Sequence, residues 1–334
     1  MKIVCYGVRP IEEPYFKKLN KDHFDLKLVS AFLTNDNGDE AEGMDAVLVR
    51  GNCAVNEKNL NLFASYGIKY VFTRSVGFNH IDLKTAKQLG IQIARVPNYS
   101  PYAVAELAMT LGMQMFRHVN LAINDSRQGD FTVKPTLFSR EVHSSTVGII
   151  GAGKIGLTEA KLYHGMGAHV LAFDPHPYEA AKQYVDFVGM DELLAKSDIV
   201  SIHVPYFPGK NDNMINADTF KQMKDSAIFV NTARGEIVDT RAVIDAIKDQ
   251  QIAGYATDVV IDEKQIMNKQ FPSLDDLPNA DVKEMAKLYP RVVITPHMGS
   301  FTEPALEDMI SISFDNFAET LKTGTNPNVI EYKG

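Results

Sequence analysis

The chain has 334 residues, of which 45% are hydrophobic and 23% are charged, and its formal net charge is −8. The length suggests two domains, and the composition is globular and excludes extensive disorder. No block of like charge stands out, which argues against a nucleic acid or a membrane surface as a partner. The first residues form a strand pattern rather than a signal peptide, and no apolar run reaches about 18 residues, so we expect a cytoplasmic protein.

Cys5 and Cys53 are the only cysteines, and we expect both to be inert reduced thiols. The nine histidines are scattered. Their spacing from other potential ligands does not predict a metal site, so we expect no metal.

Residues 1–99 alternate strand-like and helix-like segments. Apolar, β-rich runs predict buried parallel strands at residues 2–7, 45–50, 70–74 and 92–96. Helical spacing between them covers residues 57–66 and 83–89. These segments predict an α/β domain that precedes any cofactor motif.

A domain boundary is predicted at residues 97–101. Ser100 is a good helix N-cap, and Pro101 suits the first helical position. The helix predicted over residues 102–118 is apolar nearly all round, so it should be buried between partners. It could link the domains and contribute to a subunit interface, or it could be an internal core helix.

The central motif is a Gly-Ala-Gly-Lys-Ile-Gly stretch that follows an apolar β-rich segment and precedes a helix-like run. Its glycines allow a tight turn, the close approach of a pyrophosphate, and close packing of helix on strand. The phosphates would lie on unpaired N–H groups at the start of the helix. The cofactor contacts predicted here are Gly151, Gly153, Lys154, Ile155 and Gly156.

Asp174 closes the next β-rich segment. A carboxylate at this position can accept hydrogen bonds from a ribose diol but would repel a 2′-phosphate. The motif in this context therefore predicts a dinucleotide-binding domain that binds NAD rather than NADP.

After the motif, strands are predicted at residues 168–173, 199–204, 227–231, 254–258 and 292–295, with helices at 190–196, 219–224 and 240–248. With the strand before the motif they make a six-stranded doubly wound sheet, whose ligand should lie at the carboxyl ends of the strands. The long connection over residues 264–289 shows only a short helical pattern, near 282–288. A last helix, over residues 303–321, is predicted to return to the first domain.

Polar residues follow three predicted strands of the second domain: Arg234 in Asn-Thr-Ala-Arg-Gly, Glu263 five residues after Asp258, and His297 in Thr-Pro-His. With the glycine motif upstream, this combination resembles the D-2-hydroxyacid dehydrogenases over essentially the whole chain. The resemblance is closest to the D-lactate and D-2-hydroxyisocaproate dehydrogenases and extends to the (R)-2-hydroxyglutarate dehydrogenases. It implies an NAD-dependent enzyme that reversibly reduces a 2-oxo acid to the (R)-2-hydroxy acid.

The resemblance also implies a fold of two doubly wound, parallel-sheet α/β domains with a cleft between them. The flavodoxin-like substrate domain would comprise residues 1–99 and 300–334, and the Rossmann NAD domain residues 100–299. A homodimer formed through the helix over residues 102–118 is a further implication, as is hinge closure near residues 97–101 and 299–302.

The chemistry supports the roles that the resemblance implies. Hydride transfer to a carbonyl carbon requires a proton for the carbonyl oxygen, which His297 can supply. Glu263 would stabilise the imidazolium form, and Asp262 competes for this role. Arg234 offers a charged planar fork that can grip the substrate carboxylate and polarise the keto oxygen. Taken singly, each of these residues could also be structural.

The resemblance assigns two further groups of contacts. The N–H groups of Val76 and Gly77 would hold the substrate carboxylate, and Tyr102 would reach it. The remaining cofactor contacts would be Val204, Pro205, Asn211, Thr232, Ala233 and Asp258.

Two positions depart from a lactate-sized pocket. Arg50 brings a cation to the end of the second predicted strand, and Ser300 stands where that branch has a bulky aromatic residue, while Phe301 keeps the following pattern. We therefore expect a longer or acidic substrate such as 2-oxoglutarate, whose distal carboxylate Arg50 would pair. The alternative is that Arg50 forms an internal salt bridge and that pyruvate is the main substrate.

Other functions remain possible. An NAD-sensing corepressor-type protein would not need the complete set of arginine, glutamate and histidine. Glutamate at position 263 disfavours a formate dehydrogenase, and the absence of an added regulatory domain disfavours the larger phosphoglycerate enzymes. Glycerate oxidation stays open.

Overall fold

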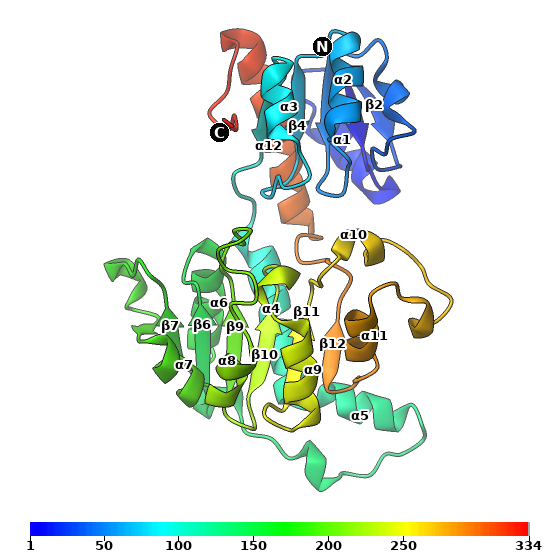
Figure 1. The fold of residues 1–334 in the computed structure, drawn as a ribbon. Coiled ribbons are helices and arrows are strands. Elements are labelled where there is room, and N and C mark those ends of the chain that lie inside the picture. The colour runs from blue at the N-terminus through cyan, green and yellow to red at the C-terminus, as the bar shows by residue number, and fades with distance from the viewer. Residues whose placement is uncertain (333–334) are drawn as a thin grey trace. The chain divides into compact units, whose positions relative to one another are not determined.

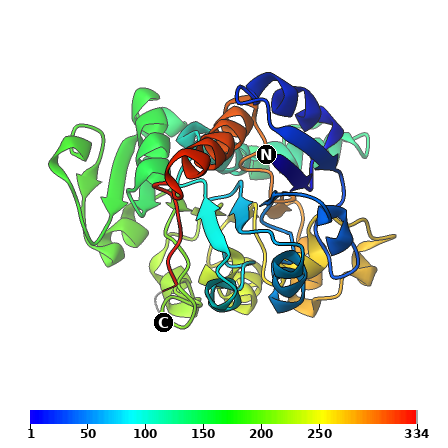
Figure 2. The same ribbon diagram turned by 90° about the horizontal axis from the view of Figure 1, so that it is seen from above.

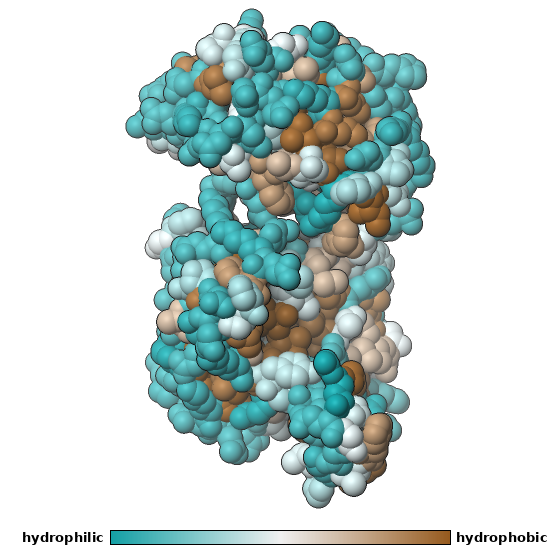
Figure 3. All heavy atoms as spheres, turned by 90° about the vertical axis from the view of Figure 1, so that its right-hand side faces the viewer, coloured by the Kyte–Doolittle hydropathy of each residue, from teal (hydrophilic) through white to brown (hydrophobic). Residues whose placement is uncertain are grey.

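The computed structural model describes residues 1–332 and separates the chain into two compact units (Figure 1). Unit 1 consists of Met1–Ser100 and the chain from Phe301 onward, and unit 2 consists of Pro101–Ser300. On the face drawn in Figure 3, hydrophilic residues cover most of the surface and apolar residues gather in a few patches. No helix within residues 1–332 is long and apolar enough to cross a membrane.

Unit 1 contains a five-stranded parallel sheet in the order β2-β1-β3-β4-β5. Its strands are β1 (Lys2–Tyr6), β2 (Asp25–Val29), β3 (Ala46–Val49), β4 (Tyr70–Thr73) and β5 (Gln92–Arg95). Helices α1 (Glu13–Leu19) and α12 (Glu303–Thr323) pack on one face of the sheet, and α2 (Glu57–Ser65) and α3 (Leu83–Gln88) on the other (Figure 2). Because both faces are covered, the apolar run of β3 is buried throughout.

Aromatic packing fixes α12 against this sheet. The ring of Phe317 stacks on that of Phe72 in β4, with 4.4 Å between centroids, and Phe314 meets Phe16 of α1 edge-on at 6.0 Å. The last helix therefore completes the core that the first hundred residues begin.

Unit 2 contains a seven-stranded parallel sheet in the order β12-β11-β10-β9-β6-β7-β8. Its strands are β6 (Thr146–Ile150), β7 (His169–Phe173), β8 (Asp186–Phe187), β9 (Ile199–Ile202), β10 (Ile228–Asn231), β11 (Gly254–Thr257) and β12 (Val292–Ile294). One face carries α4 (Pro101–Phe116) and α6 (Lys154–Gly165); the other carries α7 (Met190–Lys196), α8 (Ala217–Gln222), α9 (Thr240–Lys248) and α11 (Ala280–Ala286). The strand order reverses between β6 and β9, and such a reversal is where ligands bind in doubly wound sheets.

The sequence predicted four strands in the first sheet and six in the second, and the described residues form five and seven. Both missed strands lie at sheet edges. β2 alternates charged and apolar residues and is largely half-buried, and β8 has only two residues. Edge strands lack the continuous apolar run that marks a central parallel strand, so the pattern did not reveal them.

The helix predicted over residues 102–118 is shorter in the structure. α4 ends at Phe116, His118 has a positive φ of 54°, and a separate helix α5 (Val119–Ser126) follows. α4 packs against α6 and the strands β9 to β11 of its own unit. It is therefore a core helix of unit 2, one of the two roles considered, although Tyr102 in its first turn is 51% exposed.

Candidate active site

The glycine-rich loop joins β6 to α6 at the carboxyl edge of the second sheet. Gly151 has a φ of 92°, a left-handed conformation that favours glycine. A Cβ at Gly156 would overlap the carbonyl oxygen of Gly151, whereas a Cβ at Gly153 would meet open space. Gly153 is the N-cap of α6, and no side chain caps the first N–H groups of this helix. The loop thus presents unpaired N–H groups beside free space, an arrangement that fits a pyrophosphate.

Asp174 follows β7 and lies against the same loop. Its Oδ2 accepts a hydrogen bond from the N–H of Ala152 at 2.9 Å, and its Oδ1 accepts one from the N–H of His176 at 2.8 Å. The spacing along the chain did not predict this contact between Asp174 and the glycine loop. Because a carboxylate has about four acceptor sites, the side chain retains the capacity to bind a ribose diol.

The turn after β10 is held by the buried side chain of Asn231. Its Oδ1 accepts a hydrogen bond from the N–H of Ala233 at 2.9 Å, and its Nδ2 donates to the carbonyl oxygen of Arg234 at 2.9 Å. Within this turn the Thr232 hydroxyl is buried and has no hydrogen-bond partner among the described residues. Because buried polar atoms are normally paired, Thr232 fits a contact with a bound cofactor.

The other predicted cofactor residues lie on the loop after β9 or in the first turn of α6 and are exposed or half-buried. Asn211 closes the loop after β9, since its Nδ2 donates to the carbonyl oxygen of Pro205 at 2.8 Å and its Oδ1 accepts from the N–H of Phe207 at 2.7 Å. Half-buried positions are Val204 and Ile155, and exposed ones are Pro205 and Lys154.

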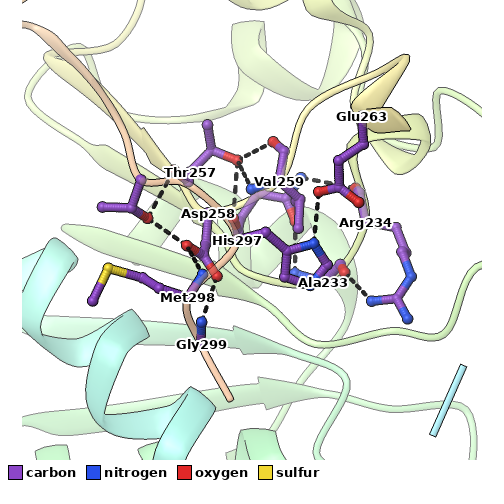
Figure 4. A network of polar contacts seen from close by, with 11 residues as sticks. Ala233, Arg234, Thr257, Asp258, Val259, Glu263, His297, Met298 and Gly299 are labelled. Atoms are coloured by element: carbon purple, nitrogen blue, oxygen red, sulfur yellow. Dashed lines mark hydrogen bonds and ion pairs between the residues drawn. The ribbon is translucent and has the colours of Figure 1, made fainter. Parts of the chain in front are cut away.

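His297 and Glu263 form a hydrogen-bonded pair at the carboxyl edge of the sheet in unit 2 (Figure 4). The Nδ1 atom of His297 lies 2.7 Å from Oε1 of Glu263. The His297 side chain is 37% exposed and that of Glu263 is 23% exposed. The Nε2 atom of His297 has no hydrogen-bond partner within residues 1–332, so the pair leaves this nitrogen available to a ligand.

Asp258 holds the segment that carries His297 (Figure 4). Its Oδ1 accepts hydrogen bonds from Thr295 Oγ1 at 2.6 Å and from the N–H of Met298 at 2.9 Å. Its Oδ2 accepts one from the N–H of Gly299 at 2.8 Å. The resemblance suggested a contact between Asp258 and the nicotinamide; the geometry gives this buried carboxylate the additional task of shaping the histidine loop.

The structure distinguishes the two candidate acids beside His297. Asp262 accepts a hydrogen bond from Nδ2 of Asn279 at 2.8 Å, whereas Glu263 contacts the imidazole. Arg234 is half-buried, and its Nη1 donates to the carbonyl oxygen of Ala233 at 2.7 Å. In Figure 4 its guanidinium lies on the same side of the network as the Glu263 carboxylate.

A second pair of histidine and glutamate, which the sequence analysis missed, lies behind the glycine loop. Glu159 on α6 and His203 after β9 approach to 2.5 Å between Oε2 and Nε2, and both side chains are buried. A Cβ at Gly151 would lie 3.0 Å from the His203 carbonyl group, so this pair borders the loop directly. The two residues are 44 positions apart, and neither stands in a motif that signals the contact.

Unit 1 gathers three arginines around Glu12 at the carboxyl ends of its strands. Glu12 Oε2 lies 2.8 Å from Arg74 Nη2, and Oε1 lies 3.6 Å from Arg9 Nη1 and 4.0 Å from Arg50 Nη1. Burial, together with Arg74 and Arg9, lowers the pKa of Arg50 to about 10. Nη1 of Arg50 is buried and forms no hydrogen bond with the described residues. The internal salt bridge considered for Arg50 is therefore present but long, and the cluster carries two positive charges in excess.

The predicted substrate residues divide between the units. Val76 and Gly77 are half-buried in the loop after β4 of unit 1, and their N–H groups have no acceptor among the described residues. Phe301, also in unit 1, lies beneath the Arg9 guanidinium, 4.2 Å from its ring centroid. Tyr102 and Ser300 are the second and last residues of unit 2.

A metal site is not supported within residues 1–332, because no group of three or more His, Cys, Asp or Glu side chains could hold an ion.

Comparisons with known proteins identify the relatives of this chain. Residues 109–299 match the NAD-binding domain of the D-isomer specific 2-hydroxyacid dehydrogenases. The chain is similar to a D-lactate dehydrogenase of Lactiplantibacillus plantarum, with 35% identity over 99% of this chain and 100% of that protein. It is also similar to the aromatic 2-oxoacid reductase of Clostridium sporogenes, with 32% identity over 98% of each chain.

A solved structure shows the same relationship. The NAD-complexed D-isomer specific 2-hydroxyacid dehydrogenase of Lactobacillus delbrueckii ssp. bulgaricus is 34% identical, with a TM-score of 0.87 over 99% of this chain and 100% of that chain. The predicted family, the two parallel-sheet α/β domains and the NAD cofactor are thereby confirmed.

Proposed function

The chain belongs to the D-isomer specific 2-hydroxyacid dehydrogenases, which makes it an NAD-dependent oxidoreductase, and we propose that Arg234, Glu263 and His297 carry out its chemistry. The reaction is the reversible reduction of a 2-oxo acid to the (R)-2-hydroxy acid. Bound NADH would supply the hydride to the carbonyl carbon, and the carbonyl oxygen would take a proton from the protein.

The observation that carries the proposal is the hydrogen bond between His297 Nδ1 and Glu263 Oε1. It orients the imidazole ring and supports proton donation from Nε2, the nitrogen without a partner among the described residues. Glu263 balances the charge of the imidazolium form while the proton is held. Arg234 would grip the carboxylate of the substrate and stabilise charge that develops on the keto oxygen.

The site also fits the cofactor. The space at Gly153, the uncapped start of α6 and the Asp174 carboxylate would hold the pyrophosphate and a ribose of NAD. The unpaired Thr232 hydroxyl would take part at the end of β10. Measuring 2-oxo-acid-dependent oxidation of NADH and NADPH tests the proposal, with chiral analysis of the product. A preference for NADPH or an (S)-product would contradict it.

The cluster at Glu12 favours a second candidate substrate. A D-lactate dehydrogenase-like activity on pyruvate is the simpler assignment, but two uncompensated positive charges would be better matched by a 2-oxo acid with a distal carboxylate, such as 2-oxoglutarate. Ser300 in place of an aromatic residue would leave room for the longer chain. The kcat/KM values for pyruvate, 2-oxoisocaproate and 2-oxoglutarate, with and without Arg50→Gln, decide between them. A poor rate with 2-oxoglutarate and no effect of the variant would exclude the acidic substrate.

We propose a cytoplasmic homodimer as the working form, and exposed apolar residues support the dimer. α5 and the segment after it leave large apolar side chains on the surface, namely Val119, Ile123, Phe131, Val133 and Phe138. Such clusters mark interaction surfaces, and they follow directly on the helix that the sequence analysis placed at the subunit contact. Sedimentation should show a dimer that Phe131→Ser with Val133→Ser weakens; a monomeric unaltered chain would exclude it.

A further inference from the structure

The turn after β4 has its carbonyl oxygens held by side chains. Arg95, the last residue of β5, donates from Nη1 to the carbonyl oxygen of Val76 at 3.0 Å. Ser75 donates from Oγ to the carbonyl oxygen of Gly77 at 2.8 Å. The Arg95 guanidinium also lies 5.3 Å from the ring centroid of Phe78, the next residue of the turn. Two successive peptide groups are thus fixed from their oxygen side.

A chain of hydroxyl groups supports the Ser75 contact, and its direction follows from the number of hydrogens. Ser75 uses its only hydroxyl hydrogen on Gly77, so at its 2.7 Å contact with Thr73 Oγ1 it must accept. Thr73 has then used its own hydrogen. At the 3.3 Å contact with His80 Nε2 the imidazole is therefore the donor. Every hydrogen bond of the chain points toward the carbonyl oxygen of Gly77.

This arrangement decides where the N–H groups of the turn point. In a trans peptide the N–H of one residue points opposite to the carbonyl group of the residue before it. With the Val76 oxygen on Arg95 and the Gly77 oxygen on Ser75, the N–H groups of Gly77 and Phe78 face the other way. Neither has an acceptor among the described residues, although both residues are half-buried.

We propose that Arg95 is a positioning residue, which works with the chain of hydroxyls to aim the N–H groups of Gly77 and Phe78 at the substrate carboxylate. Arg95 does not itself touch the substrate, and Phe78 N–H is an additional donor. The inference rests on the proposed function, in which this turn holds the carboxylate. It accounts for the half-buried Arg95, at the end of the edge strand β5, donating a hydrogen bond to a backbone carbonyl.

The test compares variants that remove the two supports separately. Arg95→Met should raise the KM for the 2-oxo acid and the inhibition constant of oxamate, a non-reactive carboxylate analogue, about tenfold, as loss of one charge-assisted hydrogen bond would. Ser75→Ala and Thr73→Val change no charge and should raise both constants in the same direction by a smaller factor. The dissociation constant of NADH should stay unchanged, because NADH binds unit 2. Arg241→Met, which removes a surface arginine of α9, is the matched control.

The outcomes separate this inference from the proposed function. If Arg95→Met reduces the 2-oxo acid normally, with unchanged KM and oxamate binding, then Arg95 is a structural residue whatever its effect on the melting temperature. This result would overturn the inference and leave the proposed function intact. A second result would also overturn it: a raised KM in Arg95→Met while the KM and the oxamate inhibition constant stay unchanged in Ser75→Ala and Thr73→Val. The charge of Arg95 acting directly on the substrate would then be the cause, and not the position of the turn. An unaltered chain that reduces no 2-oxo acid would overturn both. If Arg95→Met does not fold, the two neutral variants decide.

Discussion

Three pairs of histidine and carboxylate in the described part of unit 2 have similar contact distances and very different surroundings. In the pair of His203 and Glu159 the contact is 2.5 Å, and the side chains are 3% and 0% exposed. In the pair of His297 and Glu263 it is 2.7 Å, with exposures of 37% and 23%. In the pair of His169 and Asp186 it is 2.8 Å, with exposures of 58% and 70%. Because the chemistry is common to all three, burial decides what each pair can do.

The side chains of the buried pair are only 3% and 0% exposed, so this pair cannot meet a ligand. The backbone of His203 lies against the loop at Gly151. The exposed pair is surrounded by water, which weakens any charge interaction. The pair of His297 and Glu263 lies between these limits. Its carboxylate holds Nδ1 and orients the ring, while Nε2 stays accessible, and this combination is what a general acid requires.

The strongest test of this comparison is His297→Asn. The amide can keep a hydrogen bond to Glu263 but cannot donate a proton to the substrate, so kcat for 2-oxo acid reduction should fall about a thousandfold, within the range known for general acids. Steady-state kinetics with saturating NADH measures this. The affinity for NADH and the melting temperature should stay close to those of the unaltered chain. A loss of less than tenfold would mean that another group donates the proton.

The buried pair should respond in stability rather than in chemistry. His203→Leu leaves the Glu159 carboxylate without its partner at 0% exposure, which should lower the free energy of unfolding by about 3–5 kcal/mol. Urea denaturation measures the loss.

The double variant Glu159→Leu with His203→Leu is the control for the His203 prediction. It leaves neither polar group unpaired and should recover much of the stability. Equal stability of His203→Leu and the unaltered chain would show that the carboxylate does not depend on the imidazole.

The sequence revealed site residues with a local spacing, but it did not reveal pairs that depend on how distant elements pack. Gly151, Gly153, Gly156 and Asp174 could be identified because their spacing is local and each type has a steric or electrostatic reason at its position. The pairing of Glu159 with His203 depends on how α6 packs beside β9, which no spacing along the chain encodes. The same holds for Glu12, whose arginine partner Arg74 is 62 residues away.

Elements were predictable to the extent that burial shaped their composition. The inner strand β3 is a continuous apolar run, and β10 is apolar up to its last residue, Asn231; both were found, whereas the edge strands β2 and β8 were not. The end of α4 was predicted too late, because the helix is interrupted at His118 by a positive φ, which the residue type does not predict.

Glu263→Gln should have an intermediate effect. The amide keeps the shape of the side chain but loses the charge that balances the imidazolium form, so kcat should fall about ten- to a hundredfold, the equivalent of one hydrogen bond between charged groups. The matched control is Asp262→Asn, which removes the neighbouring acid that contacts Asn279 instead of the imidazole. If Asp262→Asn lowered kcat as much as Glu263→Gln, the two acids would not have the separate roles that their contacts indicate.

The smallest effect is expected for Asp186→Asn, which breaks the exposed pair. Its partner His169 begins β7, and the contact between the side chains is 2.8 Å long, against 2.7 Å and 2.5 Å in the other two pairs. Since water and salt screen both groups, the free energy of unfolding should change by no more than about 1 kcal/mol, and kcat should not change. Urea denaturation at low and high ionic strength checks this. A loss comparable to that of His203→Leu would show that contact geometry, and not burial, sets the strength of these pairs.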